Sequence, residues 1–396
     1  MPSLLTPELI DFIREHEDEA VDRLLLSARR FPGVPLPFVA EQILARRQAK
    51  EKLPTWYANR RIVFPSRVAV EQASSEVAAG YKRRLFAGDS LCDLTGGLGV
   101  DASAFAGVAR QVVYADRDPA CCQAAEENFK TLGLTNISVC QGDAGEVLAG
   151  VRADTLYVDP SRRPGGDKRV FALADCAPDV LQLKPLLLER APRLVVKCSP
   201  MVDITEGLAL LPECEEVHIL AVRNECKELL FTLGRVYRPG NAAIRAVNVT
   251  ASGEEQSLAF FPGEEREAAP REAARVEGFL YEPHAAIMKA GAFKVVATRF
   301  DLCKLHPRSH LYTADRRLEG FPGKMFAVDD VIPFSGKALT ALARSCPRAN
   351  ITTRNFTLSV AELRRKSGIA DGGDAHIFAT TLSGKGALLV VCHRVE

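Results

Sequence analysis

Residues 91–105 read LCDLTGGLGVDASAF, and this stretch decides the fold. It begins with an apolar segment, continues with three glycines within four positions, and ends in a run typical of a helix. Glycine loses more conformational freedom on folding than any other residue, so a cluster of glycines costs entropy. Such a cluster is expected only where the backbone makes a close contact or an unusual turn. The pattern predicts a strand, a glycine-rich loop and a helix, with the loop backbone lying against a ligand.

Segments typical of strands alternate with helical segments from residue 89 to residue 200, which is the pattern of a doubly wound parallel sheet. Two further apolar runs, 215–223 and 228–236, are separated by only four residues. This link is too short for a crossover helix, so the two runs form an antiparallel hairpin. The fold class is therefore α/β, with five parallel strands and an antiparallel closing pair. The expected parallel strands cover residues 90–94, 111–116, 136–143, 155–160 and 193–200.

Three aspartates follow three successive expected strands. Asp93 ends the first strand, Asp116 ends the second, and Asp143 follows the third. Ligands of open α/β sheets bind at the carboxyl ends of the strands, so these side chains are candidate ligand contacts. Any one of them is also explained as a turn or helix-cap residue, but three in succession favour a binding site.

The glycine loop reads DxTGGxG, with a carboxylate before the glycines. A dinucleotide fingerprint reads GxGxxG and holds a pyrophosphate at a helix N-terminus. A carboxylate repels pyrophosphate but accepts hydrogen bonds from an ammonium group, and S-adenosylmethionine carries an ammonium group at one end and adenosine at the other. The sequence therefore favours this cofactor over a nicotinamide dinucleotide, with Asp116 on the ribose hydroxyls and Asp143 on the adenine amino group.

Residues 89–236 resemble the class I S-adenosylmethionine-dependent methyltransferases, which have a Rossmann-like sheet of this topology. Several motifs also resemble a group of bacterial methyltransferases with a C-terminal THUMP-like domain, and they are spread over nearly the whole chain. These motifs are EQASSEVAAGYK (71–82), DLTGGLGVD (93–101), VDPSRR (158–163), NECKELL (224–230), LYEPHAAIMKAGAF (280–293) and ITTRNFTLSVAELRRK (351–366).

The resemblance implies further cofactor contacts in the glycine loop and upstream of it. In this fold the segment before the first strand often reaches the methionine end of the cofactor, which makes its polar residues candidates. The candidates beyond the three strand-end aspartates are Thr95, Gly96, Gly97, Gly99 and Asp101 in the loop, and Glu71, Gln72, Ser74 and Ser75 upstream.

The succession of helical and strand-like segments along the chain, together with the resemblance, predicts four regions. Residues 1–84 form an N-terminal helical region, and 85–236 form the cofactor-binding methyltransferase domain. Residues 237–335 form a mixed β/α region, in which 281–300 is expected to be helical. Residues 336–396 form a small THUMP-like α+β domain.

The acceptor site is expected after the fourth strand, at Asp159-Pro160-Ser161-Arg162. Methyltransferases of this fold often have Asp or Asn, two prolines and an aromatic residue here, and the first residue accepts hydrogen bonds from the target amine. This chain matches the first two positions and has no aromatic residue, so Arg162 is the candidate to stack on a base or pair with a phosphate. Asp159 is predicted to orient the acceptor for direct methyl transfer.

Cys198 offers a different chemistry. RNA uridine C5-methyltransferases look similar, with DPPR after the fourth strand and SCNP after the fifth, and a thiolate adds to the pyrimidine. Lys197 beside Cys198 is expected to lower the pKa of the thiol. Against this reading, 39 residues separate Asp159 from Cys198, and the sequence contains no evident general base.

The substrate is predicted to be a base of tRNA or rRNA, on the THUMP-like resemblance and three basic patches at residues 46–67, 162–169 and 337–394. The net charge of +1 gives no general attraction to nucleic acid, so binding depends on such patches. Alternatives are a protein or small-molecule methyltransferase and a non-catalytic RNA-binding protein. Eleven cysteines without a CxxC pair indicate reduced thiols in the cytoplasm, with neither a metal site nor a membrane partner expected.

Overall fold

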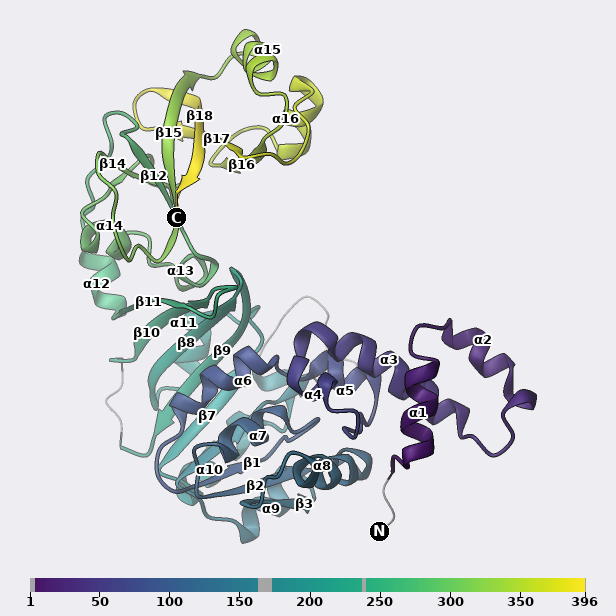
Figure 1. Ribbon diagram of the computed structural model, residues 1–396. Helices are drawn as coiled ribbons and strands as arrows, with labels where there is room; N and C mark the ends of the chain where they lie inside the picture. Colours follow the sequence, from purple (N-terminus) through teal and green to yellow (C-terminus); the bar gives the residue numbers. More distant parts are fainter. Residues whose placement is uncertain (1–3, 163–172, 237–239, 396) are drawn as a thin grey trace. The chain divides into compact units, whose positions relative to one another are not determined.

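The computed structural model describes residues 4–162, 173–236 and 240–395 (Figure 1). The chain divides into two compact units. The first comprises Met1–Val217 and Lys227–Asn241, and the second comprises His218–Cys226 and Ala242–Glu396.

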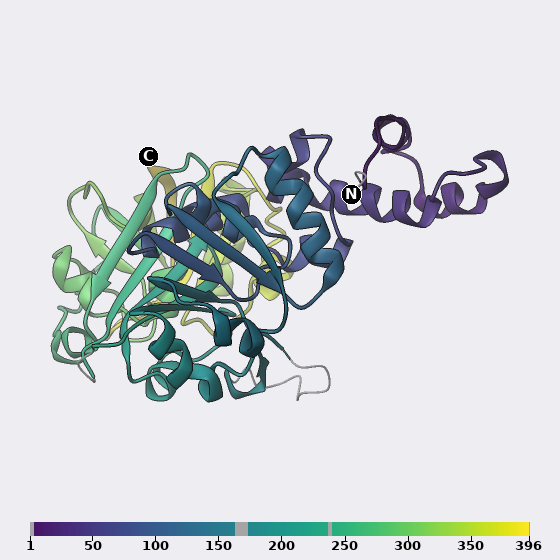
Figure 2. The same ribbon diagram turned by 90° about the horizontal axis from the view of Figure 1, so that it is seen from below.

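The first unit begins with the expected helical region. In both views its helices α1 and α2 lie to one side of the sheet (Figure 1 and Figure 2). The first helix starts at a proline, and the hydroxyl of Thr6 before it accepts a hydrogen bond from the Leu9 N–H, which is a standard N-cap. The helices are α1 (Pro7–Glu15), α2 (Val21–Leu26), α3 (Leu36–Lys52), α4 (Pro54–Ala58), α5 (Arg67–Gln72) and α6 (Glu76–Lys82).

A hydrophobic cluster packs this helical region onto the glycine-rich loop. Ala45 and Ala49 of α3 pack with Trp56 of α4, and Leu98 of the loop belongs to the same buried cluster. The N-terminal helices thus support the segment that the sequence singles out as the binding loop.

The large sheet has nine strands in the order β11-β10-β8-β9-β7-β4-β1-β2-β3. The pairs β1–β2, β2–β3, β1–β4 and β4–β7 are parallel, and β7–β9 is antiparallel. The prediction of five parallel strands with an antiparallel closing pair is confirmed. The strands are β1 (Ser90–Asp93), β2 (Gln111–Asp116), β3 (Ile137–Gln141), β4 (Thr155–Val158), β7 (Arg193–Cys198), β8 (Cys214–Val222), β9 (Glu225–Gly234), β10 (Ala243–Val249) and β11 (Glu255–Phe260).

Helices connect the parallel strands, and the central strands are buried, as expected for a parallel sheet covered on both faces. A two-stranded sheet, β5 (Ser161–Arg162) with β6 (Cys176–Ala177), follows β4. The connecting helices are α7 (Val100–Ala106), α8 (Pro119–Thr131), α9 (Ala144–Gly150), α10 (Val180–Arg190) and α11 (Ile204–Leu210).

The second unit contains a seven-stranded sheet in the order β13-β14-β12-β15-β18-β17-β16. β15 lies before residue 336 and pairs with β18, so strands from both sides of that expected boundary belong to one sheet. The strands are β12 (Phe279–Pro283), β13 (Cys303–Lys304), β14 (Tyr312–Ala314), β15 (Gly323–Pro333), β16 (Asn350–Arg354), β17 (Ala375–Leu382) and β18 (Gly386–Val395). The helices are α12 (Pro262–Glu267), α13 (Ala285–Ala290), α14 (Val295–Arg299), α15 (Gly336–Ser345) and α16 (Val360–Ser367).

The single helix expected over residues 281–300 was wrong. Residues 279–283 form β12, which pairs with both β14 and β15, and α13 and α14 follow it. Gly291 ends α13 in the left-handed conformation, at φ 69°, which separates the two helices. No helix in the described part of the chain is long and apolar enough to cross a membrane.

Packing between α11 and β9 gives a testable prediction. A Cβ atom added to Gly207 would lie 2.6 Å from Cζ of the buried Phe231 ring, so Gly207→Ala should destabilise the first unit by about 1–3 kcal/mol. Gly80 lies exposed in α6 with no atom within 4 Å of its added Cβ, and Gly80→Ala should instead stabilise by about 0.5–1 kcal/mol.

Urea titration followed through the single tryptophan, Trp56, measures both variants, since all three positions belong to the first unit. An unchanged or higher urea midpoint for Gly207→Ala would contradict the packing described here.

Candidate cofactor and acceptor site

The glycine-rich loop between β1 and α7 is tied to the end of β2 by its backbone. Gly96 N–H donates to the carbonyl of Ala115 at 2.8 Å, and Gly97 N–H donates to Oδ2 of Asp116 at 2.7 Å. The Tyr114 hydroxyl donates to the carbonyl of Gly97 at 2.6 Å. The loop is therefore fixed before any ligand binds.

The three glycines have different reasons to be glycine. A Cβ on Gly96 would lie 2.1 Å from the Tyr114 ring, and a Cβ on Gly99 would lie 2.9 Å from the Phe129 ring, at a φ of 88°. Gly97 has a φ of 52°, and its nearest atom would be a backbone oxygen 4.0 Å away. The expectation that a missing side chain leaves room for a ligand therefore fits Gly97, while the other two glycines are explained by packing within the protein.

Asp93, at the end of β1, has a carboxylate oxygen without a partner. Oδ1 accepts a hydrogen bond from the Thr95 N–H at 3.0 Å, but the buried Oδ2 has no hydrogen-bond partner among the described residues. Burial raises the pKa of Asp93 well above its ordinary value, and the nearby carboxylates of Asp101, Asp159 and Asp116 raise it further. An ammonium group would satisfy this oxygen and offset the repulsion. The residues present thus fit the ammonium end of S-adenosylmethionine.

Asp116 and Asp143 lie where the sequence places them, at the ends of β2 and β3. Asp116 is half-buried, and its Oδ1 accepts from the Asp118 N–H at 2.8 Å. Asp143 is exposed and caps α9, since its Oδ1 accepts from the Glu146 N–H at 3.0 Å in a capping box. The cap alone explains Asp143, so its contact with adenine stays a prediction.

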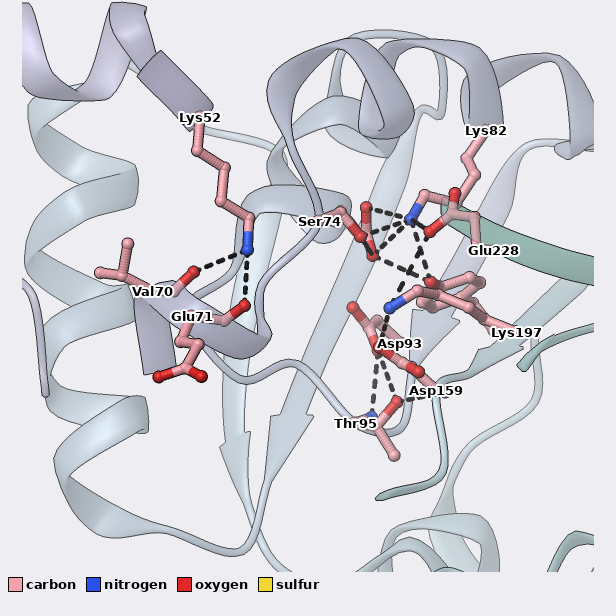
Figure 3. A network of polar contacts seen from close by, with 12 residues as sticks. Lys52, Val70, Glu71, Ser74, Lys82, Asp93, Thr95, Asp159, Lys197 and Glu228 are labelled. Atoms are coloured by element: carbon pink, nitrogen blue, oxygen red, sulfur yellow. Dashed lines mark hydrogen bonds and ion pairs between the residues drawn. The ribbon is translucent and has the colours of Figure 1, made fainter. Parts of the chain in front are cut away.

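Beside the glycine loop lies a buried charge network around Lys82 (Figure 3). Lys82 is completely buried, and its Nζ lies 2.8–2.9 Å from both carboxylate oxygens of Asp101 and 3.2 Å from Oε2 of Glu228. It also donates to the Ser74 hydroxyl at 2.6 Å, and the Tyr157 hydroxyl donates to Asp101 at 2.8 Å. Ser74 and Asp101 thus contribute to this network.

Sequence reasoning missed Lys82, Tyr157 and Glu228. The available signal was weak, because Lys82 ends the motif EQASSEVAAGYK and Glu228 lies in NECKELL, each a charged residue next to apolar ones. Charged residues are seldom fully buried unless they are paired, so only the structure shows that the two motifs share one network.

Asp159, the expected acceptor residue, forms an ion pair with Lys197 of β7. Lys197 Nζ lies 2.5 Å from Oδ2 of Asp159 and 3.9 Å from Oε2 of Glu228. Burial alone would lower the pKa of Lys197, but these carboxylates raise it above its ordinary value, so the ammonium stays charged. Asp159 N–H also donates to the Thr95 hydroxyl at 2.7 Å, which joins the end of β4 to the glycine loop.

The site therefore holds more carboxylates than ammonium groups. A bound cation would reduce this imbalance, whereas a pyrophosphate would increase it. The carboxylates are Asp93, Asp101, Asp159 and Glu228, and the ammonium groups are those of Lys82 and Lys197.

The candidates upstream of β1 differ in position. Glu71 and Gln72 are exposed, and Ser75 caps α6 by accepting from the Ala78 N–H at 3.2 Å. The carbonyl of Glu71 accepts a hydrogen bond from Lys52 Nζ at 2.6 Å (Figure 3). No contact of Glu71, Gln72 or Ser75 reaches the charge network among the described residues, so their role toward a cofactor stays a prediction.

Cys198 does not have the environment of a nucleophile. It is buried, and burial raises its pKa above the ordinary value, with a further contribution from Asp159. Lys197 does lower the pKa of this thiol, as expected, but burial and the Asp159 carboxylate outweigh it, so the net shift is upward. A buried thiol with a raised pKa is unreactive, which disfavours the thiolate mechanism.

The remaining acceptor residues follow β4. Pro160 is half-buried. Ser161 is exposed, and the Ser161 hydroxyl donates to the carbonyl of Ala177 at 3.5 Å. Arg162 forms β5 with Ser161, and nothing in the structure tests its predicted contact with a base or phosphate. The expected basic patch at 162–169 otherwise lies outside the described residues, and so do its members Arg163, Lys168 and Arg169.

The basic patch at residues 46–67 is partly internal. Arg46 is buried and donates to the carbonyls of Arg60 and Ile62 at 2.7 and 2.8 Å. Arg60 forms an ion pair with Glu17 at 2.6 Å. Some of its cations therefore stabilise the helical region, and a role of the patch toward RNA stays a prediction. Its exposed basic residues include Arg47, Lys50, Arg61 and Arg67.

The sheet order and the glycine loop define a class I methyltransferase. Residues 279–322 match a family model of a ferredoxin-like domain, and residues 323–394 match one described as THUMP domain-like. A crystal structure assigned as a methyltransferase from Porphyromonas gingivalis W83 is 35% identical, covers 98% of both chains and has a TM-score of 0.89. An uncharacterised S-adenosylmethionine-dependent methyltransferase of Mycobacterium tuberculosis H37Rv is 29% identical over 84% of this chain and 89% of its own length. The chain belongs to this family of S-adenosylmethionine-dependent methyltransferases with a C-terminal THUMP-like domain.

The unpaired oxygen of Asp93 predicts how cofactor binding depends on pH. Asp93→Asn should lower the affinity for S-adenosylmethionine at least tenfold, since a hydrogen bond to a charged group is lost. Because the pKa of Asp93 is raised, wild-type affinity should fall as the pH decreases through that pKa and the carboxyl becomes protonated. The Asn variant should lack this dependence.

Titration calorimetry over a pH series measures both effects. Asp203→Asn is the matched control, since Asp203 has no proposed contact with the cofactor, its Oδ1 caps α11 by accepting from the Glu206 N–H at 2.9 Å, and Asn caps helices as well as Asp does. Equal affinities of wild type and Asp93→Asn for S-adenosylmethionine would contradict the assignment of Asp93 to the ammonium group.

The Lys82 network predicts a large effect on stability. Lys82→Met would leave Asp101 and Glu228 buried without their ammonium partner, which costs about 3–5 kcal/mol in comparable cases. Adding Glu228→Gln should recover part of that loss, because one buried charge is removed. Urea unfolding of the single and double variants tests this, and a Lys82→Met protein as stable as wild type would show that the pairs contribute little.

Proposed function

We propose that this methyltransferase acts on RNA, and that it transfers the methyl group directly to a base of tRNA or rRNA. The observation that supports the site assignment is the buried, unpaired Oδ2 of Asp93, next to the open backbone at Gly97. The cofactor is S-adenosylmethionine, whose sulfonium supplies an electrophilic methyl group and needs no metal.

The chain's own residues would hold the two ends of this cofactor. Asp93 accepts from the ammonium group, and the backbone at Gly97 lies against the ligand. One carboxylate oxygen of Asp116 accepts from the Gly97 N–H and the other accepts from the Asp118 N–H. Each oxygen has a further lone pair that can accept from a ribose hydroxyl. Asp143 would accept from the adenine amino group.

Asp159 is the residue proposed to orient the acceptor. Lys197 Nζ donates to Oδ2 of Asp159, and the Asp159 backbone N–H donates to the Thr95 hydroxyl. Oδ1 of Asp159 has no hydrogen bond to the described residues. A carboxylate that pairs with an ammonium group is a strong hydrogen-bond acceptor. It would therefore fix an N–H of the acceptor and turn the nucleophilic lone pair toward the methyl group, so that catalysis rests mainly on positioning.

RNA is proposed as the substrate because of the THUMP-like match and the charge of the second unit. Most of the basic side chains from residue 337 onward are exposed. Two arginines of this region are instead paired, Arg354 with Glu282 and Arg364 with Asp371. The exposed ones are Lys337, Arg344, Arg348, Arg365, Lys366, Lys385 and Arg394.

Transfer of tritium from labelled S-adenosylmethionine tests the function directly. RNA from cells that lack the gene should accept label, and RNA from cells that contain it should not, because its sites are already methylated. Asp159→Asn should reduce transfer by two orders of magnitude or more while leaving cofactor affinity within a few-fold of wild type, since only acceptor positioning is lost. Label recovered only in protein or small molecules, with no binding of tRNA at low salt, would refute an RNA substrate.

A further inference from the structure

A polar pocket in the second unit has no role in the methyl-transfer site. It has a volume of about 490 Å³ and lies where the loop between β13 and β14 meets the ends of β16 and β17. Its lining residues are His306, Arg308, Thr353, Asn355, Phe356, Thr357 and Thr381.

The pocket is built by a specific set of hydrogen bonds. Asn355 has a left-handed backbone, with φ of 51°, and its carbonyl accepts from the Thr381 hydroxyl at 2.7 Å. Its side-chain Nδ2 lies 3.0 Å from Nδ1 of His306, which also accepts from the Arg308 N–H at 3.0 Å. Since Nδ1 of His306 is an acceptor, a neutral ring carries its proton on Nε2 and offers that N–H as a donor.

Hydrogen-bond donors dominate the lining. The exposed guanidinium of Arg308 and the hydroxyls of Thr353 and Thr357 form no hydrogen bond with the described residues, and no described lining residue is acidic. Lys304 lies below the same loop and donates to the carbonyl of Pro307 at 3.2 Å, which adds a further positive charge. Such a pocket fits an anionic group with several acceptor oxygens, as in a phosphate.

One wall of the pocket is aromatic. The ring of Phe356 is half-buried and is held edge-on against Phe334, with the ring centroids 4.9 Å apart. Unpaired bases of RNA stack on aromatic side chains, and each such stack contributes substantially to binding. A phosphate site beside an aromatic wall matches the repeating unit of a single-stranded nucleic acid.

We propose that this pocket binds one phosphate of a single-stranded RNA segment, with the neighbouring base against Phe356. The proposal rests on the proposed function, because it assigns a contact to the RNA substrate. Arg308 pairs with the phosphate oxygens, His306 and Thr353 donate to them, and the site is separate from Asp93 and Asp159.

Binding of a labelled single-stranded RNA, measured as a function of salt, tests the pocket. Arg308→Gln should weaken binding about tenfold and reduce the slope of log affinity against log salt by about 1, because one phosphate contact is lost. Phe356→Leu should also weaken binding about tenfold but leave the slope unchanged, because stacking releases no counterion. Arg266→Gln is the matched control, since Arg266 is exposed in the same unit, lies outside the basic region from residue 337 onward and does not line the pocket.

The outcomes separate this proposal from the proposed function. RNA binding that Arg308→Gln and Arg266→Gln weaken equally would overturn the pocket and leave an RNA substrate standing. No RNA binding by the unaltered protein would overturn both. Adenosine monophosphate binding that Arg308→Gln abolishes, with RNA binding unchanged, would assign the pocket to a free nucleotide and overturn the proposal. Thermal unfolding and calorimetry with S-adenosylmethionine verify that each variant is folded.

Discussion

Lys82 places a fully buried ammonium group among side chains from four other segments of the chain. The desolvation of an ion costs several kcal/mol, and here Asp101 of α7, Glu228 of β9, Ser74 and Tyr157 of β4 offset it. Because α7 follows the glycine-rich loop and Ser74 lies upstream of β1, this single ammonium group fixes both sides of the proposed cofactor site.

The surplus of carboxylates follows from the same buried environment. In a medium of low dielectric constant, the repulsion that Asp93 experiences from Asp101, Asp116 and Asp159 is much stronger than it would be in water. The site is therefore complementary to a cation before any ligand is bound. This is why a zwitterionic sulfonium cofactor suits the loop and a dinucleotide does not, although both classes use a glycine-rich turn after the first strand of an α/β sheet.

The sequence was sufficient to predict five parallel strands with an antiparallel closing pair, and the acids at the strand ends, because the carboxyl ends of parallel strands meet at one edge. It was insufficient for the Lys82–Glu228 pair, since 146 residues separate the two and their meeting depends on the antiparallel register of β7 and β9. The prediction of one helix over residues 281–300 was wrong because a short apolar segment can form either a helix or a strand. Here the first residues of this segment belong to β12, because they pair with β14 and β15. The capping role of Asp143 was readable from the spacing Asp143-x-x-Glu146.

Counting basic residues in the sequence does not determine which of them are exposed and which are paired inside the protein. Arg46 and Arg60 were counted toward a surface patch, yet their guanidinium groups hold backbone carbonyls and a carboxylate of the helical region. In the second unit most cations remain exposed, and Arg308, outside the counted patches, lies on a pocket of donors. A net charge of only +1 therefore hides local regions in which one sign of charge predominates. The carboxylate surplus is buried at the proposed cofactor and acceptor site, and exposed positive groups lie on both units.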